Sequence, residues 1–311
     1  MSLAVLAGAA WVIANRQEVV DQVRLLTYTP TAEARQLADN DQLQDHGRKL
    51  LYVSEPAVQD RAAFNKSCTS NEKTIVLGCY KSQRIYLYNI TDARFSGVKE
   101  VTAAHEMLHA AYERMSDAER RDVDAMLKPI VEGMTDKRIL ELIDLYNKSE
   151  PGELYNEMHS ILGTEYGTLT PELETYYQKY FKNRKVVVGF ASQYQAIFTE
   201  SKNKIDDYDR QLGELKPRIE SNNAALQNAQ SELQAENDRL AQYRAKGQIE
   251  QYNQGVSPYN AKVAAFNALI EETRRLVEQY NSMVEERNNQ VAAQDDLYQS
   301  IDSNYQTVQR Q

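Results

Sequence analysis

The stretch that decides how this sequence is interpreted is His105-Glu106-Met107-Leu108-His109. In a helix, residues four apart share one face, with about 5–6 Å between their Cβ atoms, so both imidazoles can converge on one metal ion. Glu106 projects away from the histidine pair, where its carboxylate can take a proton from metal-bound water instead of ligating the metal. The pattern HExxH therefore predicts two zinc ligands, His105 and His109, and one general base, Glu106.

The residues around this motif predict a helix with two different faces. Apolar side chains recur at helical spacing and form one stripe, made of Val101, Ala104, Leu108, Ala111 and Met115. The other stripe consists of Thr102, His105, His109 and Tyr112. Residues 116–119, Ser-Asp-Ala-Glu, have the form of a capping box, which predicts that the next helix begins there. The alternative interpretation is an ordinary amphipathic helix with two surface histidines.

The motif resembles that of the zincin metallopeptidases, over about residues 45 to 185. A metzincin would continue as HExxHxxGxxH, but residues 110–115 contain no third histidine. The chain is instead similar to the gluzincins, in which a glutamate from a downstream helix completes the site. This resemblance implies Glu157 as the third ligand, because Asn156-Glu157 matches the Asn-Glu pair of thermolysin-like enzymes. The acidic residue that those enzymes carry four positions later is Ile161 here.

The segment around Glu157 holds other candidate ligands. Catalytic zinc needs three protein ligands and an open position for water, so one side chain from this segment suffices. Glu153 is one alternative, with Glu157 then orienting a histidine, and His159 and Glu165 are two more. A solvated acidic helix face would account for the carboxylates without any metal.

Upstream of the motif, the sequence predicts a short antiparallel sheet. Residues 74–78 and 84–90 are rich in β-forming side chains and flank a turn at residues 80–83, which is typical of a hairpin. A third strand is expected at residues 49–54. In zincins an edge strand beside the HExxH helix pairs with an extended peptide, and sequence order assigns that role to residues 84–90.

The two cysteines of the chain, Cys68 and Cys79, lie on either side of the first of these strands. A disulfide between them would hold the start of the hairpin, worth roughly 2–3 kcal/mol by loop entropy. Their spacing matches no zinc-finger pattern. A disulfide implies an oxidising compartment, whereas two free buried thiols in a cytosolic protein are the alternative.

The N-terminal region, residues 1–28, begins with an uncharged apolar run at residues 3–14. A helix that spans a bilayer needs about 20 apolar residues, so this run is too short to cross alone. It is interpreted as part of a membrane anchor or signal segment, with a buried N-terminal helix as the alternative. Together with the predicted disulfide, it favours an extracytoplasmic protein that is anchored to a membrane through its N-terminus.

The C-terminal region carries a heptad repeat. The first seam consists of Ile205, Leu212, Ile219, Leu226, Leu233 and Leu240, with Tyr208, Leu215, Ala229 and Tyr243 three positions further on. After an expected break formed by Lys246-Gly247 and the turn-rich residues 253–258, the second seam consists of Tyr259, Val263, Phe266, Ile270, Thr273, Val277, Tyr280, Val284, Val291, Tyr298 and Ile301. The pattern predicts an antiparallel coiled-coil hairpin. Its first helix should start near residue 186, be about 90 Å long and be kinked or interrupted at Pro217.

Composition and charge limit the classes of protein to consider. A chain of 311 residues with 42% hydrophobic and 26% charged residues predicts an ordered, helix-rich structure. The net charge of −9 and the absence of a basic stripe argue against a nucleic-acid partner. The expected organisation is α+β: an N-terminal segment at residues 1–28, a zincin-like domain at 29–185 and the helical hairpin at 186–311.

Two functions follow from these patterns. The first is a zinc peptidase that cleaves a peptide or protein substrate, with zinc held by His105, His109 and Glu157 and water activated by Glu106. The second is a non-catalytic interaction or scaffold protein, whose coiled coil binds a protein partner and whose zincin-like domain is a relic or latent. Glu106 favours the first, because a relic has no chemical reason to keep the base beside both ligands.

Overall fold

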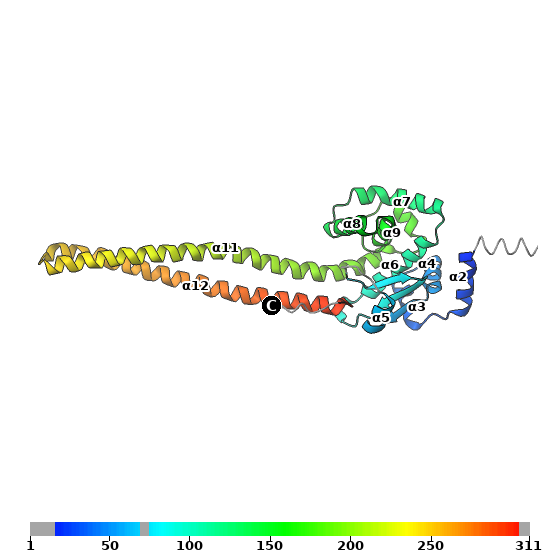
Figure 1. Cartoon of the computed structure of the whole chain (residues 1–311), viewed down its shortest axis with the longest axis horizontal. Helices are drawn as coiled ribbons and strands as arrows, with labels where there is room; N and C mark the ends of the chain where they lie inside the picture. Colours follow the sequence, from blue (N-terminus) through cyan, green and yellow to red (C-terminus); the bar gives the residue numbers. More distant parts are fainter. Residues whose placement is uncertain (1–15, 69–74, 305–311) are drawn as a thin grey trace, which may run out of the picture. The chain divides into compact units, whose positions relative to one another are not determined.

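The computed structural model describes residues 16–68 and 75–304, which are mostly helical. It divides into two compact units: one comprises the described residues up to 197 together with those from 297 onward, and the other spans 198–296 (Figure 1). The predicted apolar run at residues 3–14 lies outside the described residues, so the anchoring role of the N-terminus stays a prediction. Within the described part of the chain, no helix is long and apolar enough to span a membrane.

The sheet of the first unit is mixed rather than antiparallel, which corrects the expectation from the sequence. Strands β1 (Ala57–Gln59), β2 (Gly78–Lys81) and β3 (Arg84–Tyr88) lie in the order β1-β3-β2. β1 runs parallel to β3, while β2 and β3 form the predicted antiparallel hairpin. Ser82 and Gln83 close this hairpin, both with positive φ. Residues 75–77, predicted to be part of the first strand, precede β2 and are not in a strand, and residue 74 lies outside the description.

The other elements of the first unit are helices, and one of them replaces a predicted strand. They are α2 (Arg16–Thr27), α3 (Ala32–Asn40), α4 (Asp45–Val53), α5 (Arg61–Ser67), α6 (Val98–Glu113), α7 (Asp117–Glu132), α8 (Lys137–Ser149), α9 (Leu154–Thr164) and α10 (Pro171–Tyr177), with short 3-10 turns η1 (Ala93–Phe95) and η2 (Pro151–Glu153). The expected strand at residues 49–54 lies mostly in α4. The reason is that Leu50, Leu51 and Val53 are buried together with Gly47, a helical rather than an alternating pattern.

The helix α6 carries the HExxH motif and contacts both the sheet and α9. Its predicted apolar stripe is buried as expected, since Val101, Ala104, Leu108 and Ala111 are at most 4% exposed. The predicted capping box at the start of α7 is also present, with Ser116 and Glu119 bonding to each other's backbone N–H. The helix is therefore held on its apolar side by the core, which leaves its histidine side directed at α9.

The predicted disulfide between Cys68 and Cys79 is present. It joins the residue that ends α5 to the second residue of β2. This covalent link fixes β2, one of the two strands that contact the HExxH helix, to α5.

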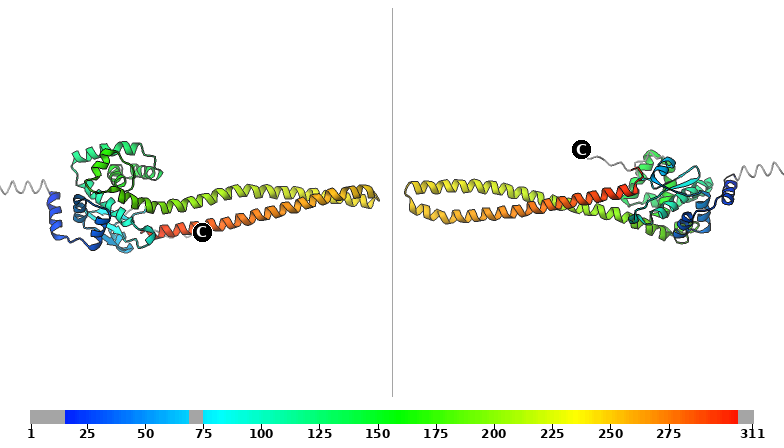
Figure 2. Two further views of the ribbon diagram at one scale, coloured as in Figure 1. Left: turned by 180° about the vertical axis from the view of Figure 1, so that it is seen from behind. Right: turned by 90° about the horizontal axis from the view of Figure 1, so that it is seen from below.

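The long helices α11 (Arg184–Ala245) and α12 (Ile249–Ile301) form the predicted hairpin, and two further views show them side by side (Figure 2). The first seam is confirmed, because its residues are buried or half-buried along α11. The turn is at residues 246–248, where Gly247 has φ +76°, which confirms the Lys246-Gly247 part of the expected break, whereas residues 253–258 are helical. Gly255 instead allows close packing, since a Cβ there would lie 2.5 Å from Leu240 Cδ2.

Two further details of the hairpin differ from expectation. Pro217 does not interrupt α11. Its side chain is exposed, and the loss of one backbone hydrogen bond costs about 3 kcal/mol, which a helix of this length tolerates. In α12 the seam includes Leu276 (7% exposed) rather than Val277 (36%), and Ile270 is likewise exposed. Apolar residues occupy three adjacent columns of α12, so the sequence alone did not indicate which two would face α11.

Candidate metal centre

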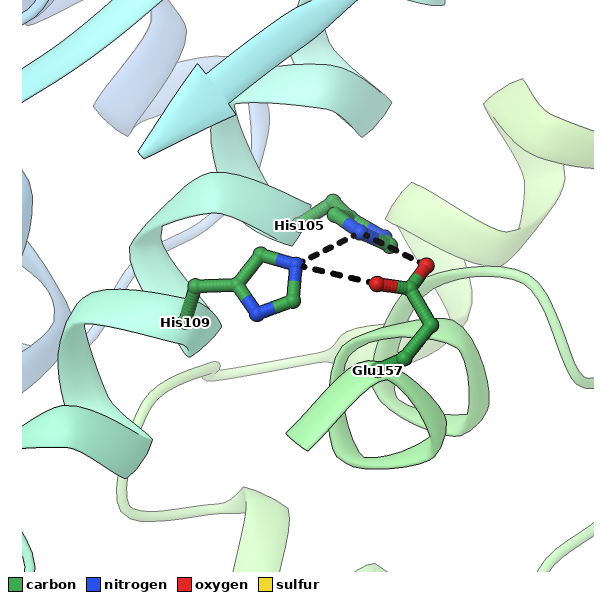
Figure 3. A group of neighbouring side chains, drawn as sticks. All are labelled: His105, His109 and Glu157. Atoms are coloured by element: carbon green, nitrogen blue, oxygen red, sulfur yellow. Dashed lines mark hydrogen bonds and ion pairs between the residues drawn. The ribbon is translucent and has the colours of Figure 1, made fainter. Parts of the chain in front are cut away.

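Two helices bring three potential ligands together. His105 and His109 extend from α6, and the Glu157 carboxylate extends toward both from α9 (Figure 3). The distances from the Glu157 oxygens are 3.5 Å to His105 Nε2 and 3.4 Å to His109 Nε2, and the two nitrogens are 3.1 Å apart. One ligand atom from each residue lies within 4.8 Å of the others. The predicted trio therefore converges on one point.

Burial and charge make this point suited to a cation. The side chains of His105 and His109 are 16% and 15% exposed, so the alternative of two surface histidines does not describe them. Burial lowers the pKa of His109, but hydrogen bonding and charge from Glu157 outweigh it and raise that pKa to about 9. The pKa of His105 is also raised, and the pKa of Glu157 is well below its usual range despite burial, because both imidazoles face its carboxylate. Positive charge, as protons or as a metal ion, is stabilised here.

The orientation of His109 is set by a residue outside the trio. Asn156 Oδ1 lies 2.9 Å from His109 Nδ1, and since a carbonyl oxygen accepts, Nδ1 is the protonated nitrogen and Nε2 faces Glu157. Asn156 Nδ2 in turn donates to Glu153 Oε2 at 2.9 Å. Glu153, a candidate ligand from the sequence, is thus an outer partner of the His109 side of the centre. The orienting role of Asn156 was not foreseen; its only signal was its place beside Glu157.

Glu165, another candidate ligand, lies on the opposite side of His105. Its Oε1 is 4.0 Å from His105 Nδ1, while its Oε2 accepts from Arg138 and from Gln195, each at 2.8 Å. The residue four positions after Glu157 is the apolar, buried Ile161, and it is Glu165, at the end of α9, that faces Nδ1 of His105. Glu165 therefore faces His105 from outside the trio, where metal-bound histidines usually have a carboxylate or carbonyl partner.

His159, the remaining candidate, points away from the trio and into the core. It is fully buried, and its Nε2 is 2.8 Å from the Tyr176 hydroxyl. Burial, together with the two charged histidines nearby, lowers its pKa to about 3, so its ring is neutral. Its ring also contacts Tyr112, Tyr177 and Tyr180. His159 is thus part of an aromatic cluster behind the centre.

The predicted base Glu106 is buried beside β2. Its side chain is close to the strand, because a Cβ on Gly78 would lie 2.9 Å from Glu106 Oε1. Its charge also contributes to the raised pKa values of both His105 and His109. Gly78 therefore provides the space in which the carboxylate sits next to the histidine pair.

The edge strand in contact with α6 is not the one expected. Residues 84–90 were predicted as the edge strand, but β3 pairs on both sides and is central, whereas β2 pairs only with β3 among the described strands. The order was not foreseen because β1 is short and pairs in parallel with β3 across a long sequence separation. β2 is therefore the edge strand in contact with α6.

One further side chain reaches the trio without a signal in the sequence. Tyr146, on α8, donates from its hydroxyl to Glu157 Oε2 at 3.1 Å. The arrangement as a whole offers two imidazole nitrogens and one carboxylate, a donor set that zinc accepts in catalytic sites, with a buried carboxylate next to it. The case for a metal centre rests on this geometry, because no protein-family model, curated protein or solved structure matches the chain.

Proposed function

We propose that the chain is a zinc-dependent peptidase, with one zinc ion held by His105, His109 and Glu157 and with Glu106 as the general base. The observation that carries this proposal is the convergence of the two Nε2 atoms on a carboxylate from a separate helix. Asn156 supports it, since its bond to Nδ1 directs the Nε2 lone pair of His109 to the shared point. The resemblance to gluzincins is consistent with this donor set.

The chemistry that zinc supplies in such a site is a bound water of pKa about 7 and polarisation of the scissile carbonyl. Glu106 accepts the proton of the attacking water and passes it to the amine that leaves. Its burial beside Gly78 keeps the carboxylate close to the histidine pair. Tyr146 is placed to donate a hydrogen bond at the Glu157 side of the centre.

The substrate we propose is an extended peptide that aligns along β2. An edge strand can pair with an added strand through its backbone, and β2 is the edge that contacts α6. The disulfide between Cys68 and Cys79 holds this strand in place and supports an extracytoplasmic location. Anchoring through residues 1–28 remains part of the same proposal.

Zinc binding tests the proposal most directly. Purified protein, stripped with a chelator and dialysed, should bind about one equivalent of zinc in a titration calorimeter and retain it on gel filtration. The zinc-loaded protein should then cleave members of a broad peptide library, and the chelated protein should not. A wild-type protein that binds no zinc stoichiometrically would rule out the metal centre. Zinc binding without cleavage would favour the coiled-coil interaction protein with a latent centre.

A further inference from the structure

The first turns of α11 contact both helices of the metal centre. These turns belong to the first compact unit, which includes the chain up to residue 197. Arg184, only 4% exposed, donates to the carbonyl oxygens of Leu162 at 3.0 Å and Tyr166 at 2.7 Å. These carbonyls lie in and just after the last turn of α9, where helix carbonyls lack partners and a cation is favoured. The start of α11 thus holds the C-terminal end of the helix that bears Glu157.

A second contact holds the start of α6. Gly97, which precedes that helix, has φ +90°, and a Cβ added there would lie 2.8 Å from Phe190 Cδ1 of α11. The glycine is required both by its backbone conformation and by this close approach. The position of the HExxH helix is therefore fixed from its N-terminal end by the same segment of α11.

The third contact is with Glu165, the carboxylate that faces the proposed ligand His105. Gln195 on α11 donates from Nε2 to Glu165 Oε2 at 2.8 Å, and Arg138 on α8 donates to the same oxygen at 2.8 Å. With Oε2 occupied by two donors, Oε1 is the oxygen turned to His105 Nδ1, 4.0 Å away. The Glu165 side chain is 10% exposed, so little water competes for it. The direction of this carboxylate is set by Gln195 and Arg138 together.

We propose that Gln195 is a positioning residue of the metal centre, acting through Glu165 on His105. This inference rests on the proposed zinc site. The distance of 4.0 Å is longer than a hydrogen bond, so in the structure the carboxylate attracts the His105 ring through its charge. A ring held in this way keeps Nε2 directed at the shared point, as outer carboxylates do for metal-bound histidines. The base of the hairpin helix is then a working part of the metal centre and not only a support for the hairpin.

The test compares Gln195→Ala with Gln193→Ala in the full chain. Gln193 lies on the same helix two residues earlier and is exposed, so it controls for helix propensity and for loss of an amide. Zinc affinity is measured by competition with a chromophoric chelator, and the Co²⁺-substituted protein is compared by its visible spectrum. Loss of an outer partner costs about 10–100-fold in metal affinity, and Gln195→Ala should fall near the lower end of that range. Gln193→Ala should match wild type.

A double-mutant cycle separates positioning from general stability. In a Glu165→Gln background, Gln195→Ala should have almost no further effect on zinc affinity, because the carboxylate through which it acts is gone. Gln195→Glu, which keeps the shape but removes the donor, should weaken zinc binding at least as much as Gln195→Ala and should shift the Co²⁺ spectrum. This isosteric variant keeps the test decisive if the alanine variant is unstable.

The possible outcomes distinguish the positioning role of Gln195 from the proposed zinc site on which it depends. If wild type binds zinc and both Gln195 variants bind it equally tightly, the positioning role is wrong while the zinc site stands. The same holds if the Gln195→Ala effect is undiminished in the Glu165→Gln background. If wild type binds no zinc, the metal centre and this inference fall together.

Discussion

The proposed metal centre and the helical hairpin each involve a pair of helices, yet the two pairs are specified differently. In the hairpin, one residue every three or four positions packs against the partner helix, and each contributes a similar, modest part. Helices α6 and α9 pack closely, and in the proposed metal centre His105, His109 and Glu157 would each supply one ligand atom. A repeated packing pattern thus tolerates an unfavourable residue such as Pro217, whereas a site formed by three converging side chains does not tolerate the loss of one of them.

The largest effect on activity is expected at Glu106, because replacing its carboxylate by an amide removes the proposed general base. Glu106→Gln keeps the shape beside Gly78 but cannot accept a proton, so peptidase activity should fall by at least about 10²–10⁴-fold. Zinc content and thermal stability should stay close to wild type. Peptide cleavage and elemental analysis on the same samples check this. Equal cleavage by the variant would show that another group acts as base.

Replacing a proposed ligand should weaken zinc binding, whereas replacing a histidine outside the site should not. His105→Ala removes one of the three proposed ligands and should abolish stoichiometric zinc binding, and Glu157→Ala should weaken it strongly. His46→Ala is the matched control, because His46 packs beside Tyr180, and its pKa is lowered by burial and nearby lysines rather than raised by a carboxylate. Calorimetric zinc titration of the three variants decides the assignment. Unchanged zinc binding by His105→Ala would show that His105 is not a ligand. The proposed centre would then tolerate the loss of one of its side chains, as the hairpin does.

In the hairpin, neighbouring residues test which column forms the seam. Leu276→Ala should lower the free energy of unfolding by about 2–3 kcal/mol, since Leu276 is 7% exposed. Val277→Ala should cost less than about 1 kcal/mol, since Val277 is 36% exposed. Urea unfolding followed by circular dichroism gives both values. Equal costs would mean that Val277 is also packed in solution.

A smaller, pH-dependent effect is expected from a buried acid of the first unit. Asp41 is fully buried, neither of its carboxylate oxygens has a hydrogen-bond partner among the described residues, and burial and Glu100 raise its pKa well above the usual value. A folded-state pKa above the unfolded value means that stability is lost as pH rises above about 4, where the unfolded state releases its proton first. The loss is complete above the folded-state pKa.

Asp41→Asn should remove this dependence. The variant should be more stable than wild type at pH 8, by about 1 kcal/mol or more, and the difference should shrink toward pH 4. Asp238→Asn, at an exposed position of the hairpin, is the control and should change little at either pH. Urea unfolding at several pH values measures both. A pH-independent difference for Asp41→Asn would assign its effect to packing instead of charge.

Local patterns in the sequence determined a large part of this protein. The HExxH spacing placed two imidazoles on one face of α6, the capping box began α7, and the heptads along α11 marked its buried face. These features depend on residues within one or two helical turns, so periodicity and short motifs are sufficient to predict them. The turn at Lys246-Gly247 was part of the expected break, whereas residues 253–258 were wrongly included because Gly255 and Pro258 are typical of a break, and α12 tolerates both.

Only the tertiary structure decided which carboxylate completes the trio and what surrounds it. Glu153, Glu157 and Glu165 are similar in chemistry, and the rotation of α9 alone turns Glu157 to both histidines. Likewise, the strand order β1-β3-β2 and the hydrogen bond from Gln195 to Glu165 depend on segments that are far apart in the sequence. Such contacts depend on how whole elements pack against one another, and no local repeat or motif records that packing.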